Sequence, residues 1–199
     1  MKKGYVHLYT GNGKGKTTAA LGLAFRAMGC GLKTYIGQFM KGQQCSELEA
    51  VKIVADYITL EQYGKTGFTR DKEHPDAESL KNAKKGLLKA RTAMLSGKYD
   101  IVVLDEINTA HFFKLITVEE MLELVKTKPD GVELIFTGRY APQELIAAAD
   151  LVTEMVEVKH YYDKGLISRK GIEIRFLRLR TKGRNHLKLK GIEERAEAC

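Results

Sequence analysis

The chain has no tryptophan, only three prolines and only three cysteines among its 199 residues. Cys30, Cys45 and Cys199 are too widely spaced for a zinc-ligand motif or a disulfide framework. The longest apolar run is far shorter than the ~20 residues of a membrane-spanning helix. Residues 1–4 lead directly into a strand-like stretch, without the hydrophobic region of a signal peptide. We therefore expect a protein of the reducing cytoplasm that does not enter a membrane.

The composition is that of an ordinary soluble globular protein, with 44% hydrophobic and 29% charged residues. The net charge of +8 allows nucleic acid, a membrane surface or polyanionic small molecules as partners. Much of the excess lies near the C-terminus, where no aromatic ladder interleaves the basic residues. We expect a single nucleotide-binding domain over residues 1–180 and a solvated basic tail over residues 181–199, with nucleic acid an unlikely partner.

Apolar strand patterns alternate along the chain with helical patterns. Strands are expected at residues 5–9, 33–40, 57–63, 100–106, 132–136 and 151–158, with an edge strand at 172–179. Helices are expected at residues 19–28, 47–55, 76–96, 117–126 and 142–149. Ser46 and Thr117 are the expected capping residues of two of these helices. This alternation predicts a three-layer α/β domain with a mainly parallel sheet.

A glycine-rich turn joins the first strand to the first helix. It reads Gly11-Asn12-Gly13-Lys14-Gly15-Lys16-Thr17-Thr18, and strand, glycine-rich turn, Lys-Thr and helix together are typical of a phosphate-binding loop. Glycines let backbone N–H groups turn towards phosphate oxygens, Lys16 adds a positive charge, and Thr17 offers a hydroxyl to Mg²⁺. The usual spacing would place the first glycine at position 10, where this chain has Thr10.

A second signal is the apolar run 101–104, which is followed by Asp105 and Glu106. Acids at the carboxyl end of a buried parallel strand face the ligand site of such sheets, together with the phosphate loop and the turn 137–139. Either acid could hold Mg²⁺, directly or through water. Lys14, Lys16 and Arg139 could neutralise a triphosphate, whereas position alone leaves Arg26 a solvated helix residue or a nucleotide contact.

Several further motifs give the chain a resemblance to one known family. These motifs are Gln38-Phe39-Met40-Lys41-Gly42, Thr66-Gly67-Phe68-Thr69, Val103-Leu104-Asp105-Glu106, Thr137-Gly138-Arg139, Ala149-Asp150-Leu151-Val152-Thr153-Glu154-Met155 and Lys159-His160-Tyr161-Tyr162-Asp163-Lys164-Gly165. In this order, together with the phosphate loop, they resemble the ATP:corrinoid adenosyltransferases of the P-loop type, the cob(I)yrinic acid a,c-diamide adenosyltransferase family. The resemblance runs from residue 11 to about residue 174.

The resemblance implies a P-loop NTPase-like (RecA-like) fold and an alkyl-transfer reaction. The Co(I) of a corrinoid attacks C5′ of ATP, and inorganic triphosphate leaves. It implies nucleotide binding by Gly11, Asn12, Gly13, Lys14, Gly15, Lys16, Thr17, Thr18 and Arg26. It further implies catalytic roles for Lys16 and Glu106, and Mg²⁺ on Thr17 and Glu106, with Asp105 as the other candidate ligand.

Phe68 matches a family aromatic that occupies the lower face of the corrinoid and helps to make Co(II) easier to reduce. Family members can carry a tryptophan two residues later, where this chain has Arg70. The resemblance further implies an electron donor such as reduced flavodoxin or flavin, a homodimer and a place in cobalamin biosynthesis. The alternatives are a small P-loop ATPase or kinase, with Glu106 orienting water, and a nucleotide-regulated nucleic-acid-binding module that uses the basic tail.

Overall fold

The computed structural model describes residues 2–43, 45–65, 74–166, 169 and 171–172. Its centre is a six-stranded sheet in which every strand pair is parallel, in the order β3-β2-β4-β5-β1-β6. The strands are β1 (Val6–Thr10), β2 (Thr34–Phe39), β3 (Ile58–Tyr63), β4 (Ile101–Asp105), β5 (Glu133–Thr137) and β6 (Leu151–Glu154). The prediction of a mainly parallel sheet is confirmed.

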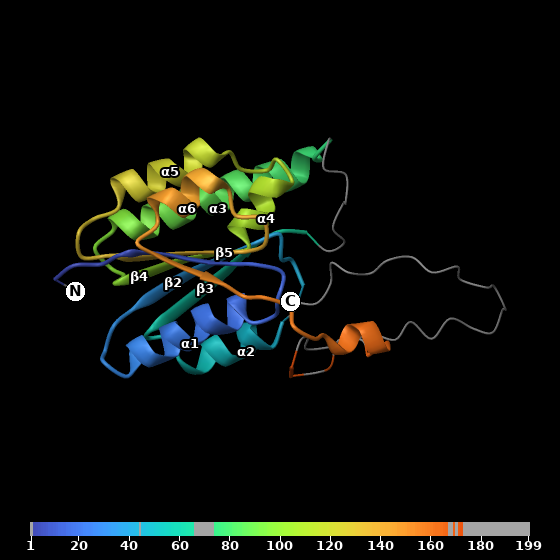
Figure 1. Cartoon of the computed structure of the whole chain (residues 1–199). Coiled ribbons are helices and arrows are strands. Elements are labelled where there is room, and N and C mark those ends of the chain that lie inside the picture. Colours follow the sequence, from blue (N-terminus) through green and yellow to red (C-terminus); the bar gives the residue numbers. More distant parts are fainter. Residues whose placement is uncertain (1, 44, 66–73, 167–168, 170, 173–199) are drawn as a thin grey trace.

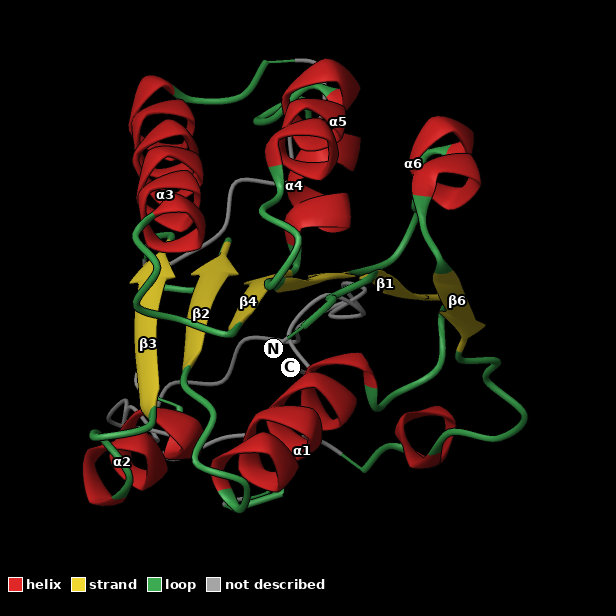
Figure 2. Ribbon diagram, turned by 90° about the vertical axis from the view of Figure 1, so that its left-hand side faces the viewer, coloured by secondary structure: helices red, strands yellow, loops and turns green. Residues whose placement is uncertain are grey.

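Helices cover both faces of this sheet. They are α1 (Lys16–Met28), α2 (Ser46–Ile53), α3 (Ala77–Leu95), α4 (Ile107–Phe112), α5 (Val118–Thr127) and α6 (Gln143–Ala148), followed by the 3₁₀ turn η1 (Tyr161–Lys164). Figure 1 and Figure 2 show α1 and α2 on one face and α3 to α6 on the other. The predicted three-layer α/β architecture of a P-loop NTPase-like protein is therefore confirmed.

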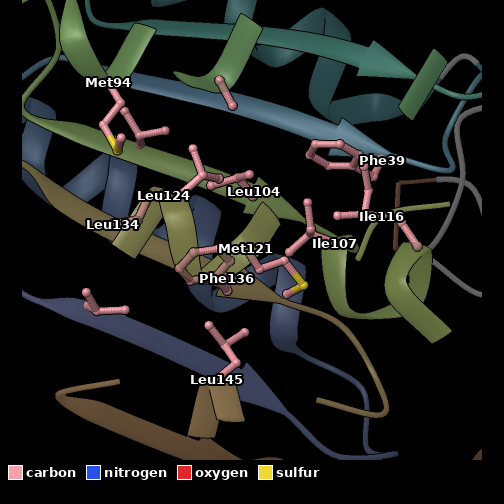
Figure 3. Close-up of a cluster of buried hydrophobic side chains, with 14 of the residues drawn as sticks. Phe39, Met94, Leu104, Ile107, Ile116, Met121, Leu124, Leu134, Phe136 and Leu145 are labelled. Atoms are coloured by element: carbon pink, nitrogen blue, oxygen red, sulfur yellow. The ribbon is translucent and has the colours of Figure 1, made fainter. Parts of the chain in front are cut away.

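The two layers of helices enclose two separate hydrophobic cores. Figure 3 shows the core on the α3–α5 side, where Leu104 and Phe136 of the sheet meet Met121 and Leu124 of α5. On the other face, the small buried residues of α1 pack against the sheet; they are Ala20, Ala24 and Ala27. Burial from both sides explains why β4 is apolar at every position before Asp105.

The predicted helix caps have different outcomes. Thr117 caps α5, and its hydroxyl and the Glu120 carboxylate form the expected reciprocal capping box. The cap predicted at Ser46 is wrong, because α2 begins at Ser46 itself and follows Cys45, which makes no side-chain capping hydrogen bond. The helix thus begins one residue earlier than the predicted 47–55 and ends two residues earlier, at Ile53.

Strand β6 is shorter than the predicted 151–158, because the chain leaves the sheet at Met155 to contact the phosphate loop. The Met155 N–H donates to the Thr10 carbonyl at 2.9 Å, and the Met155 carbonyl accepts from Gly13 N–H at 2.7 Å. The edge strand predicted at 172–179 lies, apart from Ile172, outside the described residues.

The parallel topology brings the ends of distant sequence segments to one edge of the sheet. Strand β5 lies between β1, which ends at the phosphate loop, and β4, which ends at the acidic pair. The segments that follow β1, β4 and β5 therefore lie next to one another. Within the described part of the chain, no helix has the length and apolar character to span a membrane.

Candidate nucleotide site

The phosphate loop needs glycine where it contacts the segment after β6. Gly11 has φ +93°, and a Cβ there would lie 2.4 Å from the Met155 carbonyl oxygen. Gly15 has φ +123°, which is also unfavourable for residues with a side chain. The shifted first glycine thus has a structural reason: Thr10 is still part of β1, and the chain turns only at Gly11.

Lys16 holds the loop together from within. Its Nζ donates to the carbonyl oxygens of Gly11 and Gly13, each at 2.8 Å. Burial lowers the pKa of Lys16 below its ordinary value, although the nearby carboxylate of Glu106 opposes this effect. The loop therefore carries a partly desolvated ammonium at its centre, which is a suitable partner for phosphate oxygens.

Asp105, at the end of β4, is 1% exposed and accepts four hydrogen bonds. Its Oδ1 accepts from the hydroxyls of Thr17 (2.9 Å) and Thr137 (2.6 Å). Its Oδ2 accepts from Gln38 Nε2 (3.1 Å) and Lys41 Nζ (3.0 Å). Burial raises the pKa of Asp105, but Lys41 and the hydroxyl donors outweigh it and hold the pKa below its ordinary value.

Glu106 differs from its neighbour because it lines the pocket. It adopts a left-handed backbone conformation, with φ 61°, just before α4. Its N–H donates to the Thr137 hydroxyl at 3.0 Å, and its Oε2 accepts from the Thr109 hydroxyl at 2.5 Å. Two threonines thus fix the backbone and the carboxylate of Glu106 at the mouth of the site.

One pocket collects these groups. Its lining residues are Gly13, Lys14, Gly15, Lys16, Thr17, Glu106, Arg139 and His160. Arg139 Nη2 donates to the Asn12 carbonyl at 3.3 Å, which ties the turn after β5 to the loop. The predicted convergence of the phosphate loop, Glu106 and Arg139 is present in the structure, and four of the eight lining residues are lysine, glutamate or arginine.

Some residues named from the sequence lie away from the pocket lining. Thr18 is exposed in the first turn of α1, and Arg26 is exposed in its last turn. Asn12 is an exposed residue of the loop whose carbonyl contacts Arg139. Phe68 and Arg70 lie outside the described residues.

Two residues were not assigned a role from the sequence. Lys41 and His160 both belong to motifs that carry the family resemblance, but only the structure shows Lys41 on Asp105 and His160 in the pocket. No periodicity or spacing links Lys41 to Asp105. Their proximity arises because β2 and β4 are adjacent, with Gln38 in register with Asp105.

The residues present fit a magnesium ion that is shared with a phosphate ligand. The Thr17 hydroxyl donates its hydrogen to Asp105 and accepts a long hydrogen bond from Lys41 Nζ at 3.5 Å, which leaves one lone pair of its oxygen for a cation. Glu106 adds a carboxylate in the same pocket. In the described part of the chain, no three acidic, His or Cys side chains form a cage for a metal. Mg²⁺ commonly needs only one or two carboxylates besides phosphate and water.

A parallel sheet, a glycine-rich loop between β1 and α1 and an acidic pair at the end of a neighbouring strand define a P-loop nucleotide-binding protein. The family model of the ATP:corrinoid adenosyltransferases BtuR/CobO/CobP matches residues 2–174, and the chain belongs to this family.

Similar proteins bear the corresponding names. The corrinoid adenosyltransferase of Sinorhizobium sp is 35% identical over 178 residues, which cover 86% of this chain and 81% of the relative. The corrinoid adenosyltransferase of Escherichia coli (strain K12) is 31% identical, with 86% of each chain covered. The corrinoid adenosyltransferase CobA of Salmonella typhimurium is 32% identical, also with 86% of each covered.

Proposed function

We propose that this protein transfers the 5′-deoxyadenosyl group of ATP to the Co(I) of a corrinoid and releases inorganic triphosphate. The family match and the names of the relatives support this reaction, and they do not favour a small P-loop ATPase or kinase. The structural observation that carries the proposal is the pocket in which the phosphate loop, Glu106 and Arg139 meet.

The loop from Gly11 to Thr18 would hold the triphosphate. Lys16 is already at its centre, and Lys14 and Arg139 line the same pocket, so three cations can oppose the charge of the triphosphate. The N-terminus of α1, which begins at Lys16, adds free N–H groups. The resemblance adds Arg26 to the nucleotide contacts, although this side chain lies at the opposite end of α1 from the pocket.

Thr17 and Glu106 would hold Mg²⁺ together with the triphosphate. Asp105 is saturated by its four donors, so its part would be to orient the Thr17 hydroxyl or to act through water. When bound, Mg²⁺ would neutralise charge on the leaving triphosphate.

The remaining work of the protein is positioning and charge stabilisation. The Co–C bond forms as the bond between C5′ and the triphosphate oxygen breaks, and the cobalt supplies the electron pair. Because Co(I) is itself the nucleophile, no activated Ser or Cys is needed. Lys16 would stabilise negative charge on the departing oxygen, and Glu106 would act through the cation beside it.

Several finer features of the proposal rest on the resemblance. Phe68 would contact the lower face of the corrinoid, and an electron donor such as reduced flavodoxin or flavin would supply Co(I). We further propose a cytoplasmic homodimer whose catalytic domain comprises residues 1–180, followed by the basic tail 181–199. The end of the family match at residue 174 supports a boundary in this region.

The test is an anaerobic absorbance assay with ATP, Mg²⁺ and chemically reduced cobalamin, in which triphosphate is measured alongside adenosylcobalamin. The two products should appear in equal amounts, and only with reduced corrinoid present. ADP and phosphate formed without corrinoid would instead identify an ATPase.

A further inference from the structure

His160 has one ring nitrogen committed to the backbone. It precedes η1, and its Nδ1 accepts a hydrogen bond from the Tyr162 N–H at 3.1 Å. A ring nitrogen that accepts a hydrogen bond carries no hydrogen, so in the neutral imidazole the proton is on Nε2. The local turn therefore selects the tautomer of His160, and Nε2–H is a donor.

The turn that carries His160 is fastened to the phosphate loop. The Tyr161 hydroxyl accepts from Lys14 Nζ at 2.9 Å, and the His160 and Tyr161 rings lie 4.7 Å apart. Upstream, Met155 exchanges backbone hydrogen bonds with Thr10 and Gly13. Contacts on both sides thus fix the ring relative to the loop.

The ring also belongs to the pocket wall. His160 lines the cavity together with Lys16, Thr17, Glu106 and Arg139. Within the described residues, Nδ1 makes the only hydrogen bond of this side chain, so Nε2–H has no partner there. A half-buried donor without a protein partner, beside a cluster of cations, suits an anionic ligand.

We propose that His160 donates a hydrogen bond from Nε2 to the triphosphate group of ATP and to the triphosphate that leaves. The inference rests on the proposed function, since it concerns the ligand of the same pocket. His160 differs from Lys14, Lys16 and Arg139 because its ring orientation is fixed by the hydrogen bond from the Tyr162 N–H to Nδ1. Its Nε2–H is therefore presented in one direction.

Two conservative substitutions separate the two nitrogens. In His160→Asn, the short amide oxygen can still accept from Tyr162 N–H, but nothing replaces Nε2. In His160→Gln, the longer side chain can bring its amide N–H to the position of Nε2, but its acceptor is poorly placed for the cap. Lys164→Ala, an exposed change in the same turn, is the control.

The measurements are titration calorimetry with inorganic triphosphate and Mg²⁺, thermal unfolding, and ¹⁵N NMR of the histidine ring. For His160→Asn we expect an unfolding midpoint close to that of the original protein and roughly tenfold weaker triphosphate binding, which is the scale of a hydrogen bond to a charged group. His160→Gln should bind triphosphate more tightly than His160→Asn. The ring should show the Nε2–H tautomer, with a shift of that nitrogen on adding triphosphate.

Triphosphate binding by His160→Asn that equals that of the original protein would overturn the inference and leave His160 a structural cap. The Lys16→Ala variant distinguishes this result from a failure of the proposed function. If Lys16→Ala loses binding but His160→Asn does not, only the role of His160 is wrong. If the original protein binds triphosphate no better than Lys16→Ala, both the proposed function and the inference fail.

Discussion

Lys41 Nζ lies 3.0 Å from Oδ2 of Asp105, at the carboxyl edge of the sheet. The two side chains are 11% and 1% exposed, so the ion pair is largely desolvated. Lys41 follows β2, and the pairing of β2 with β4 brings it beside the end of the neighbouring strand. The charge of Asp105 is thus balanced by the protein itself, whereas Glu106 faces the pocket.

Replacing Lys41 by Met should destabilise the protein by about 3–5 kcal/mol at pH 7, because it leaves a buried carboxylate without its cation. The pKa of Asp105 is lowered in the folded protein, so this group contributes stability above the unfolded-state pKa of about 4, and loses it as the pH falls through the folded pKa. Without Lys41, burial dominates and the pKa of Asp105 rises. The difference between the two proteins should therefore shrink as the pH falls towards 4.

Urea unfolding between pH 4 and pH 8 measures this difference. Lys52→Met is the matched control, because Lys52 forms an exposed ion pair with Glu49, and its loss should cost less than about 1 kcal/mol. Equal losses of stability from the two substitutions at pH 7 would show that the buried Lys41–Asp105 pair stabilises the protein no more than an exposed ion pair does.

Gly11→Ala should disrupt the phosphate loop. The backbone at Gly11 has φ +93°, and the new methyl group would lie 2.4 Å from the Met155 carbonyl oxygen. Backbone strain alone costs about 1–3 kcal/mol, and relief by movement of the loop would separate Lys16 from its carbonyl partners. Calorimetry should show weaker ATP binding, and denaturant unfolding should show a lower free energy of unfolding.

Gly22 provides the opposite case within α1. A Cβ at this helical position meets nothing within 4 Å, so Gly22→Ala should raise the free energy of unfolding by about 0.4–1 kcal/mol. ATP binding should be unchanged. Similar losses of stability in Gly11→Ala and Gly22→Ala would show that the positive φ at Gly11 is not the cause of the effect there.

Lys16→Ala should abolish measurable ATP binding, because it removes the ammonium at the centre of the loop. We expect affinity to fall at least ~100-fold, which corresponds to about 2.7 kcal/mol. Lys33→Ala is the control in the same calorimetric titration, because Lys33 is exposed and precedes β2, at the end of the strand that lies away from the site. Retained binding in Lys16→Ala would remove Lys16 from the proposed site.

Thr17→Ala and Glu106→Gln should each weaken the binding of Mg²⁺. Thr17 loses a hydroxyl ligand and Glu106 a charged one, so the Mg²⁺ concentration for half-maximal triphosphate binding should rise about tenfold. Calorimetry over a Mg²⁺ series measures this. Unchanged half-saturation in both variants would place the ion elsewhere.

Phe68→Ala should spare ATP binding and impair the reduction of bound Co(II) corrinoid, if Phe68 contacts the lower face of the ring. Calorimetry checks the first effect, and anaerobic reduction followed by absorbance checks the second. Reduction at the original rate would remove Phe68 from the proposed corrinoid site.

The sequence by itself determined the class of fold and the centre of the site. Alternating strand and helix patterns predicted the three layers, and the loop from Gly11 to Thr18 predicted phosphate binding, because both depend on local spacing. The acids after residues 101–104 were recognisable for the same reason. The cap at Ser46 and the length of β6 were mispredicted, because local patterns do not include the contacts of Cys45 and Met155.

Only the tertiary structure showed which of the two acids is bound by protein donors and which one faces the pocket. Adjacent strand ends turn Asp105 inwards to Lys41, Gln38, Thr17 and Thr137, while the left-handed backbone at Glu106 brings that residue to the pocket. The same applies to His160, which lies about 145 residues from the phosphate loop along the chain and reaches it through Met155 and Tyr161. Such contacts depend on strand order and register, and neither can be read from the spacing of residues along the sequence.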